Sequence, residues 1–173
     1  HMGIVSGISH PSLNLVLEIV NEFDILGVIT EPVPRKTLGD LLYRDGRLTI
    51  PAALKYLDSV IDALCAVHRF GLVHGDVRPD VIHIDDERSR VILSELGLLK
   101  AYYTAFYNGS IPDGIQVGTP PYQSPEHLTS IGRLSTASDV WQLGVILYEK
   151  GYIDAPQIKI VLNGVLKASS AAT

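Results

Sequence analysis

Cysteine is almost missing from the sequence, because Cys65 is the single one among 173 residues. One cysteine cannot form an internal disulfide, which fits a reducing compartment, and we expect a cytoplasmic location. The helical spacing of apolar residues around Cys65 favours a small core residue over a reactive nucleophile.

Excess positive charge and long apolar runs are missing as well. The formal net charge is -5, which gives no electrostatic attraction to nucleic acid or to an anionic membrane surface. No apolar run approaches the roughly 20 residues of a membrane-spanning helix, and we see no signal peptide pattern. We therefore expect no nucleic-acid partner and no membrane span in this chain.

The residues that are present suffice for one folded domain. Hydrophobic residues make up 46% of the chain and charged residues 19%, a balance typical of a globular domain with its own core. His1-Met2 is typical of an expression scar. Residues 168–173 are small and polar, which predicts a disordered tail.

Charged residues gather in one turn, within residues 72–85, which read LVHGDVRPDVIHID. The short apolar runs 72–73 and 81–84 predict strands on either side, and Pro79 excludes a central strand through the turn. A charged loop between two buried strands often directs a carboxylate into a cleft. The alternative is an ordinary hairpin with a solvated tip. The polar residues of the turn are His74, Asp76, Arg78 and Asp80.

Three further stretches follow in a defined order. Residues 94–97 read SELG, residues 118–126 read GTPPYQSPE, and residues 138–149 read SDVWQLGVILYE. Together with the charged turn, they resemble in order and spacing the protein kinase motifs HRDLKPxN, DFG, GTxxYxAPE and SDVWSxGVxLYE. The resemblance covers roughly residues 9–149, and we suggest bacterial serine/threonine kinases as relatives. It implies an α+β fold, a mainly helical kinase-like C-lobe with short β-hairpins, from which most of the N-lobe is absent.

The resemblance implies roles for particular residues. Asp76 stands where kinases carry the base that accepts the hydroxyl proton, and Arg78 stands where they carry a lysine facing the phosphate. The segment that would dock a substrate contains Gly118, Thr119 and Tyr122.

Other positions depart from the kinase pattern. Val81 replaces a metal-binding asparagine, and its hydrocarbon side chain cannot coordinate Mg²⁺. Glu95 replaces the metal-binding aspartate, so it is either a displaced metal ligand or an ordinary surface acid. The GxGxxG loop, the phosphate-binding lysine and its glutamate partner are missing, because the chain begins near the family's fourth strand. We therefore expect this chain alone to bind ATP weakly.

The N-terminal part predicts a hairpin and a connector. The apolar runs 15–20 and 25–31 predict two paired strands, which Pro32 and Pro34 end. By resemblance the connector corresponds to the hinge between kinase lobes. This puts Thr30 at the gatekeeper position and Glu31 and Val33 along the edge of adenine. The alternative is a proline-rich loop that binds nothing.

Two helices are expected after the connector. Thr37 and Asp40 predict a capping box for a helix over residues 38–45, and Gly46 ends it. Pro51 suits the first turn of a longer helix. The apolar stripe expected on that helix consists of Leu54, Leu57, Ile61, Leu64, Cys65 and His68.

A turn over residues 86–90 and a strand over 91–93 are expected next, and a last helix over 136–150. That helix is expected to direct Trp141, Val145 and Tyr148 inward. Four parts result: a tag scar with an N-terminal extension (1–7), a residual N-lobe hairpin with a hinge-like connector (8–35), a C-lobe-like domain (36–167) and the tail (168–173).

The residues leave several functions open. The first is a pseudokinase, a non-catalytic binding module in signalling that needs no cofactor. The second is a serine/threonine kinase that uses ATP and Mg²⁺ when a complete N-lobe is present. A third is a purely architectural likeness in a domain that only mediates oligomerisation. Because an isolated hairpin has unpaired edges, we also expect a protein partner or a homodimer through residues 15–31.

Overall fold

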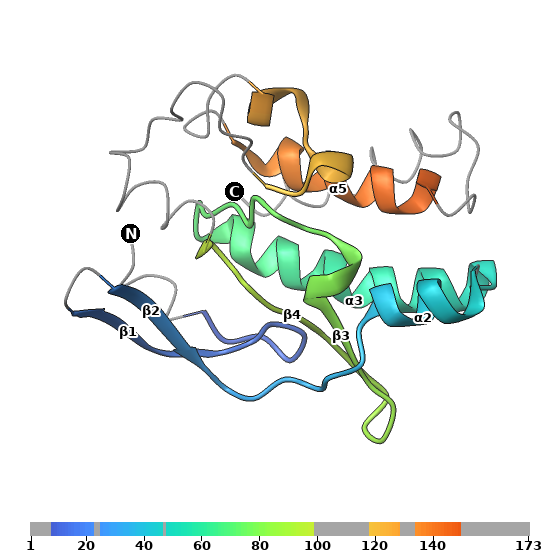
Figure 1. The fold of residues 1–173 in the computed structure, drawn as a ribbon, viewed down its shortest axis with the longest axis horizontal. Coiled ribbons are helices and arrows are strands. Elements are labelled where there is room, and N and C mark those ends of the chain that lie inside the picture. Colours follow the sequence, from blue (N-terminus) through green and yellow to red (C-terminus); the bar gives the residue numbers. More distant parts are fainter. Residues whose placement is uncertain (1–7, 23–24, 47, 99–117, 129–133, 150–173) are drawn as a thin grey trace.

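The structure, a computed structural model, describes residues 8–22, 25–46, 48–98, 118–128 and 134–149. Within these ranges two antiparallel hairpins combine with three α-helices (Figure 1). The predicted α+β class, mainly helical with short hairpins, is confirmed. The strands are β1 (Val16–Glu22), β2 (Ile25–Thr30), β3 (Ile82–Asp85) and β4 (Arg90–Leu93), and the helices are α2 (Leu38–Asp45), α3 (Ile50–Arg69) and α5 (Thr136–Glu149).

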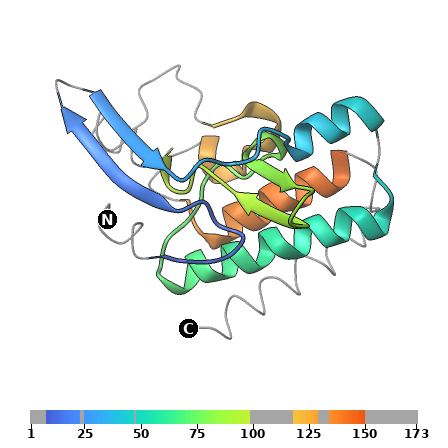
Figure 2. The ribbon, with the colours of Figure 1, turned by 90° about the horizontal axis from the view of Figure 1, so that it is seen from below.

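The hairpin β1–β2 projects from the rest of the chain as an arm (Figure 2). The arm is attached at both ends to the second hairpin, because Leu13 bridges Leu93 of β4 and Thr37 bridges His83 of β3. At the first attachment the Asn14 N–H donates to the Leu93 carbonyl at 2.8 Å. The chain therefore enters and leaves the arm along the two edges of the β3–β4 sheet.

Helix α2 has the bounds that its sequence predicts, because its signals are local. The Thr37 hydroxyl accepts from the Asp40 N–H at 3.1 Å, and the Asp40 carboxylate accepts from the Thr37 N–H at 2.8 Å. Gly46 ends the helix with a φ of +72°, a conformation that glycine adopts without strain, and donates its N–H to the Leu42 carbonyl. The predicted capping box is confirmed.

Replacing Thr37 with alanine is expected to lower the free energy of unfolding by about 1 kcal/mol, because the Asp40 N–H loses its acceptor. Urea unfolding followed by circular dichroism measures this loss. Thr49 is the matched control, since it is the N-cap of α3 and its side chain makes no capping hydrogen bond. Thr49→Ala should cost clearly less, and equal losses for the two variants would contradict the capping role of Thr37.

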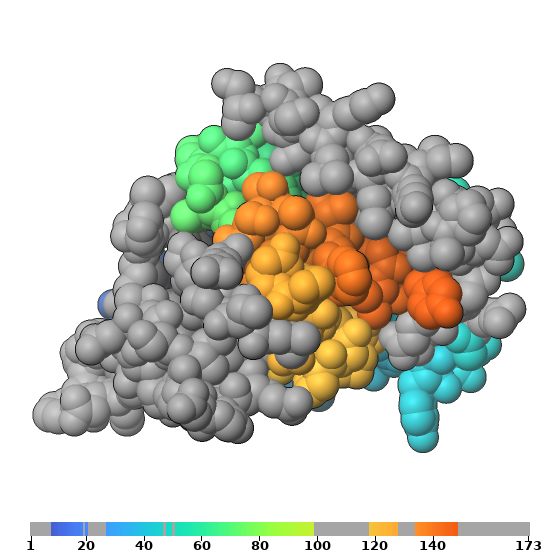
Figure 3. Space-filling view, turned by 90° about the horizontal axis from the view of Figure 1, so that it is seen from above, coloured from blue at the N-terminus to red at the C-terminus, as the bar shows by residue number. Residues whose placement is uncertain are grey.

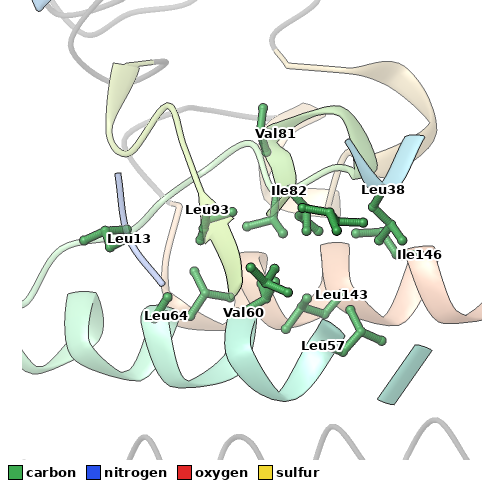
Figure 4. Close-up of a cluster of buried hydrophobic side chains, with 14 of the residues drawn as sticks. Leu13, Leu38, Leu57, Val60, Leu64, Val81, Ile82, Leu93, Leu143 and Ile146 are labelled. Atoms are coloured by element: carbon green, nitrogen blue, oxygen red, sulfur yellow. The ribbon is translucent and has the colours of Figure 1, made fainter. Parts of the chain in front are cut away.

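The core lies between the β3–β4 sheet and helices α3 and α5, which run alongside one another (Figures 1 and 2). The close-up in Figure 4 shows Leu57, Val60 and Leu64 of α3 facing Ile82 and Leu93 of the strands. One expectation for α3 is wrong, because Leu54 is exposed. Its neighbour Ala53 is buried instead, because the side of α3 that carries Ala53 and Leu57 faces the core.

Helix α5 is turned differently from the expectation. Trp141 and Tyr148 were predicted to point inward, but their exposed fractions are 47% and 64%. The helix is apolar on most of its surface, so its periodicity does not fix the buried side, and the size of the aromatic rings misled the prediction. Branched aliphatic side chains, which pack closely against α3, form the buried face: Val140, Leu143, Ile146 and Leu147.

Cys65 is half-buried on α3, and its burial raises the pKa of the thiol. This shift disfavours the thiolate, which is the nucleophilic form of cysteine. Among the described residues, no helix combines the length and apolar character needed to cross a membrane.

Candidate functional site

The loop that carries Asp76 is held in place by a buried carboxylate. Asp139 of α5 accepts from the backbone N–H groups of His74 and Gly75 at 2.9 and 2.8 Å. It also lies 2.8 Å from Nε2 of His68 on α3. Asp139 is fully buried, so its carboxylate needs hydrogen-bond donors in place of water. Within the described residues, these three groups are the donors that contact it. The carboxylate therefore fixes the loop to both long helices.

The carbonyl of Gly75 provides a second attachment. It accepts from Nε2 of His127 at 2.7 Å and from Nε2 of Gln142 at 3.1 Å. The His127 Nδ1 accepts from the Ser124 N–H at 3.0 Å, so the ring carries its proton on Nε2. The side chain of Gln142 also accepts from the Val77 N–H at 2.8 Å. The loop backbone on both sides of Asp76 is thus hydrogen-bonded to side chains.

These bonds explain why the strand predicted at residues 72–73 is wrong. The donors that would continue a strand ladder, from His74 onward, bind side chains of α5 instead. Val81 was predicted in the second strand, but it ends a 3₁₀ helix, Pro79–Val81, and β3 begins at the next residue. The loop therefore follows an irregular path, in which the Asp76 side chain is only 14% exposed.

The carboxylate of Asp76 has two partners from different parts of the chain. Its Oδ2 accepts from Nε of Arg78 at 3.1 Å, and its Oδ1 accepts from the Thr119 N–H at 3.4 Å. Gly118 has a φ of +74°, and a Cβ there would lie 3.6 Å from Asp76 Oδ1. The structure therefore brings Gly118 and Thr119, predicted at the substrate-docking segment, beside the predicted base.

Tyr122 is joined to Thr119 through the backbone, because its N–H donates to the Thr119 carbonyl at 2.9 Å. It belongs to the 3₁₀ helix Pro120–Tyr122, and its ring is buried in the core. Residues 118–128 and α5 lie side by side on one face of the molecule, as Figure 3 shows. Gly118 and Thr119 are half-buried next to Asp76, so a substrate would meet them more readily than the Tyr122 ring.

Glu95 reaches the same loop through Arg78. Its Oε2 accepts from Nη2 of Arg78 at 2.9 Å, and its backbone has a φ of +63°. A positive φ is uncommon for a residue with a side chain and often marks a functional site. Burial by itself lowers the pKa of the Arg78 guanidinium, but its hydrogen bond to Asp76 and the charges of Asp76 and Glu95 raise the pKa overall. Arg78 is thus a permanent cation between the two carboxylates.

A cleft of about 250 Å³ opens beside Glu95, between the arm and the β3–β4 sheet. Thr30 and Val33 line this cleft, and their roles at the gatekeeper and adenine edge stay predictions. The exposed side chain of Glu31 instead lines a separate groove with Pro32. The remaining lining residues are Asn14, Val16, Val28, His83, Ser94, Leu96 and Leu98.

His83 is a lining residue that sequence reasoning missed. Its Nδ1 donates to the Pro34 carbonyl at 2.7 Å, and its Nε2 lies 2.9 Å from the Ser94 hydroxyl. It thereby joins the hinge-like connector to the residue before Glu95. The sequence did contain a signal for His83, because it is a polar residue between Ile82 and Ile84 in a strand. Successive side chains of a strand point to opposite faces, so His83 lies on the face opposite to these two buried residues.

The residues at the metal-ligand positions do not fit Mg²⁺. Val81 is 1% exposed and packs in the hydrophobic core (Figure 4), so the site lacks the oxygen that an asparagine would supply. Glu95 is already paired with Arg78. Across the described ranges, no group of three or more His, Cys, Asp or Glu side chains is arranged to hold a metal ion.

Comparisons with known proteins agree with the sequence motifs. The family described as "Protein kinase domain" matches residues 2–157. The chain is similar to the serine/threonine-protein kinase PknL of Mycobacterium tuberculosis, with 36% identity over 122 residues, which cover 70% of this chain and 29% of PknL. It is also similar to the CBL-interacting serine/threonine-protein kinase 9 of Arabidopsis thaliana, with 30% identity over 168 residues, 93% of this chain and 36% of that kinase. The chain thus spans about a third of the length of these curated relatives.

Proposed function

Since the chain belongs to the protein kinase family, we propose that it is a pseudokinase, a kinase-like module that acts in signalling by binding other proteins without transferring phosphate. An active member of the family uses ATP and Mg²⁺. The observation that carries the proposal is the state of the metal position, where Val81 is buried in the core and Glu95 is paired with Arg78. A site without metal ligands loses much of the charge stabilisation on which phosphoryl transfer depends.

The second candidate is a serine/threonine kinase that is active when a complete N-lobe is present. It is favoured by Asp76, which lies beside Gly118 and Thr119 as a base beside a substrate segment would. The cleft lined by Thr30 and Val33 also suits the edge of an adenine ring. In this second case ATP and Mg²⁺ are the cofactors, and Glu95 must release Arg78 to reach the metal.

Millimolar ATP with Mg²⁺ is expected to leave the melting temperature of the protein unchanged, because the residues at the metal position do not fit the ion. A ligand at a hundred times its dissociation constant would add about 2.7 kcal/mol to the free energy of unfolding, which differential scanning fluorimetry resolves easily. An active serine/threonine kinase serves as the positive control in the same assay, together with a radiolabelled phosphate-transfer measurement. A Mg²⁺-dependent rise in melting temperature, or transfer to a peptide, would support the second candidate.

The proposal includes the division of the chain at residue 36. Residues 8–35 would form the remaining part of an N-lobe with its hinge, and the C-lobe-like part would follow from residue 36 to residue 167. A cytoplasmic location is part of the same proposal. It is supported by the single cysteine, which needs no oxidising compartment.

Protein partners are expected at the arm β1–β2. In the described part of the chain, its two strands pair only with each other, so each strand has one unpaired edge. Several relatives are named as CBL-interacting kinases, a precedent within the family for a kinase that binds a protein partner. For this chain we propose a second copy of itself, or another protein in a tight complex, docked on the arm.

A further inference from the structure

A groove of about 420 Å³ lies between the connector, residues 32–36, and the turn that joins β3 to β4. Figure 1 shows the connector passing beside this turn on its way from the arm to α2. We call this surface the connector groove. Asp76, Arg78 and Glu95 are not among the residues that line it. The connector groove is therefore a surface distinct from the candidate site.

Both walls of the connector groove are held by hydrogen bonds. The connector is attached to β3, because the Ile84 N–H donates to the Lys36 carbonyl at 2.8 Å. The turn is closed by the carboxylate of Asp85, which accepts from the backbone N–H of Arg88 at 3.1 Å and from its guanidinium at 3.0 Å. A partner therefore meets a preformed surface, and little conformational entropy is lost in ordering it.

Positive charge exceeds negative charge in the connector groove. Four basic and three acidic side chains line it, although the formal net charge of the whole chain is -5. Two of the basic side chains are paired with acids of the groove itself, Lys36 with Asp86 and Arg88 with Asp85. These internal pairs fix the walls and leave the other charges of the groove for a partner.

The two remaining basic side chains are Arg35 of the connector and Arg90 at the start of β4. Both are exposed, and within the described residues neither side chain takes part in an ion pair or a hydrogen bond. An exposed guanidinium can bind a carboxylate through two parallel hydrogen bonds. Because Arg35 and Arg90 belong to different elements, the groove presents two separate cationic groups.

We infer that the connector groove is a docking surface for an acidic segment of a partner protein, whose carboxylates pair with Arg35 and Arg90. Two separate guanidinium groups suit two separate single charges along an extended peptide. The half-buried side chain of Val33 adds apolar contact beside them. Charge complementarity of this kind selects the partner and speeds its encounter more than it raises affinity. This role goes beyond the proposed function, because it depends neither on the metal position nor on the arm.

A peptide-binding measurement tests this role. The probe is a fluorescein-labelled peptide of alternating glutamate and serine, and in the control peptide glutamine replaces each glutamate. The full chain is expected to bind the glutamate peptide roughly tenfold more tightly than the glutamine peptide in fluorescence anisotropy. Adding NaCl should reduce this difference, because salt screens interactions between exposed charges.

Variants of the groove show whether the two arginines cause the binding. Arg35→Gln and Arg90→Gln should each weaken binding of the glutamate peptide roughly threefold, and the two together roughly tenfold, because they act independently. Arg69→Gln is the matched control, since Arg69 is an exposed arginine of α3 outside the groove. Glu87→Gln removes an exposed acid of the groove and should tighten binding, a gain that damage to the fold would not produce.

The results that would overturn this role differ from those that bear on the proposed function. Equal binding of the two peptides by the wild type, or unchanged binding by the variant that lacks both arginines, overturns the docking surface. Tighter binding of a peptide with a single phosphoserine in place of the glutamates overturns the assignment to acidic segments and points to a phosphorylated partner. Phosphate transfer by the wild type contradicts the pseudokinase proposal alone and leaves the connector groove unaffected.

Discussion

Asp139→Ala is expected to lower the free energy of unfolding by about 3–5 kcal/mol, the cost of breaking a buried charged interaction. The substitution leaves the N–H groups of His74 and Gly75 and the ring of His68 without their buried acceptor. Each unsatisfied buried donor costs about 1–3 kcal/mol. Since whole domains are stable by only about 5–15 kcal/mol, this loss is a large fraction of the total stability. Urea unfolding measures the loss of free energy of unfolding, and hydrogen exchange measures the lost protection of the loop N–H groups.

Asp86→Ala is the matched control for this experiment. Asp86 is also an aspartate in an ion pair, with Lys36, but its side chain is largely exposed to solvent. Exposed pairs contribute less than about 1 kcal/mol, so the control should unfold close to the wild type. Equal losses for Asp139→Ala and Asp86→Ala would show that the loop does not depend on the buried carboxylate.

The wild-type protein is expected to form a dimer through the arm β1–β2, and Leu17→Glu to abolish it. Leu17 and Ile29 are 55% and 46% exposed, unusually high for large apolar side chains on neighbouring strands. Burying each such side chain contributes about 1.5–3 kcal/mol, and further arm residues and strand pairing add to this against the entropic cost of association. Light scattering coupled to size-exclusion chromatography at high micromolar concentration gives the mass of the assembly.

Tyr43→Glu is the matched control for Leu17→Glu. It tests whether a charged replacement of any exposed, largely apolar side chain abolishes the dimer. Tyr43 is 95% exposed on α2, outside the arm, so this variant should remain a dimer. A second arm variant, Ile29→Glu, should behave like Leu17→Glu. A folded wild type that is strictly monomeric would refute association through the arm.

The structure narrows the surface on which this association depends. From the sequence, association is expected through the whole hairpin, residues 15–31. Val28 instead lines the cleft with Val16, on the inner side of the arm. The side chains of Ile19 and Ile25 lie outside the described residues. Leu17 and Ile29 are therefore the residues that carry the prediction.

Elements with local signals could be predicted from the sequence. Helix α2 depends on Thr37, Asp40 and Gly46, which lie within ten residues, and its bounds are as predicted. The arm likewise depends on two apolar runs joined by a short turn. The orientation of α5 could not be predicted, because the side of an apolar helix that is buried depends on α3, far away in the sequence.

The candidate site, too, could be predicted from the sequence only in part. Asp76, Arg78 and Glu95 were found from motif positions, and the structure brings all three into contact. The carboxylate of Asp139 was visible within a motif, but its bonds to the loop cross more than 60 residues, and no local pattern predicts them. His127 is a similar case, because its contact with Gly75 depends on the folded path of the chain.

The attachment of Leu13 to Leu93 also bears on how the protein is made. The arm is synthesised before its docking partner β4, which is translated about 80 residues later, roughly 4–16 s at 5–20 residues per second. During this interval the arm cannot make its attachment to the β3–β4 sheet. Contacts between residues so distant in sequence also form late in folding, because a long loop must close first. The speed of synthesis should therefore influence the yield of folded protein.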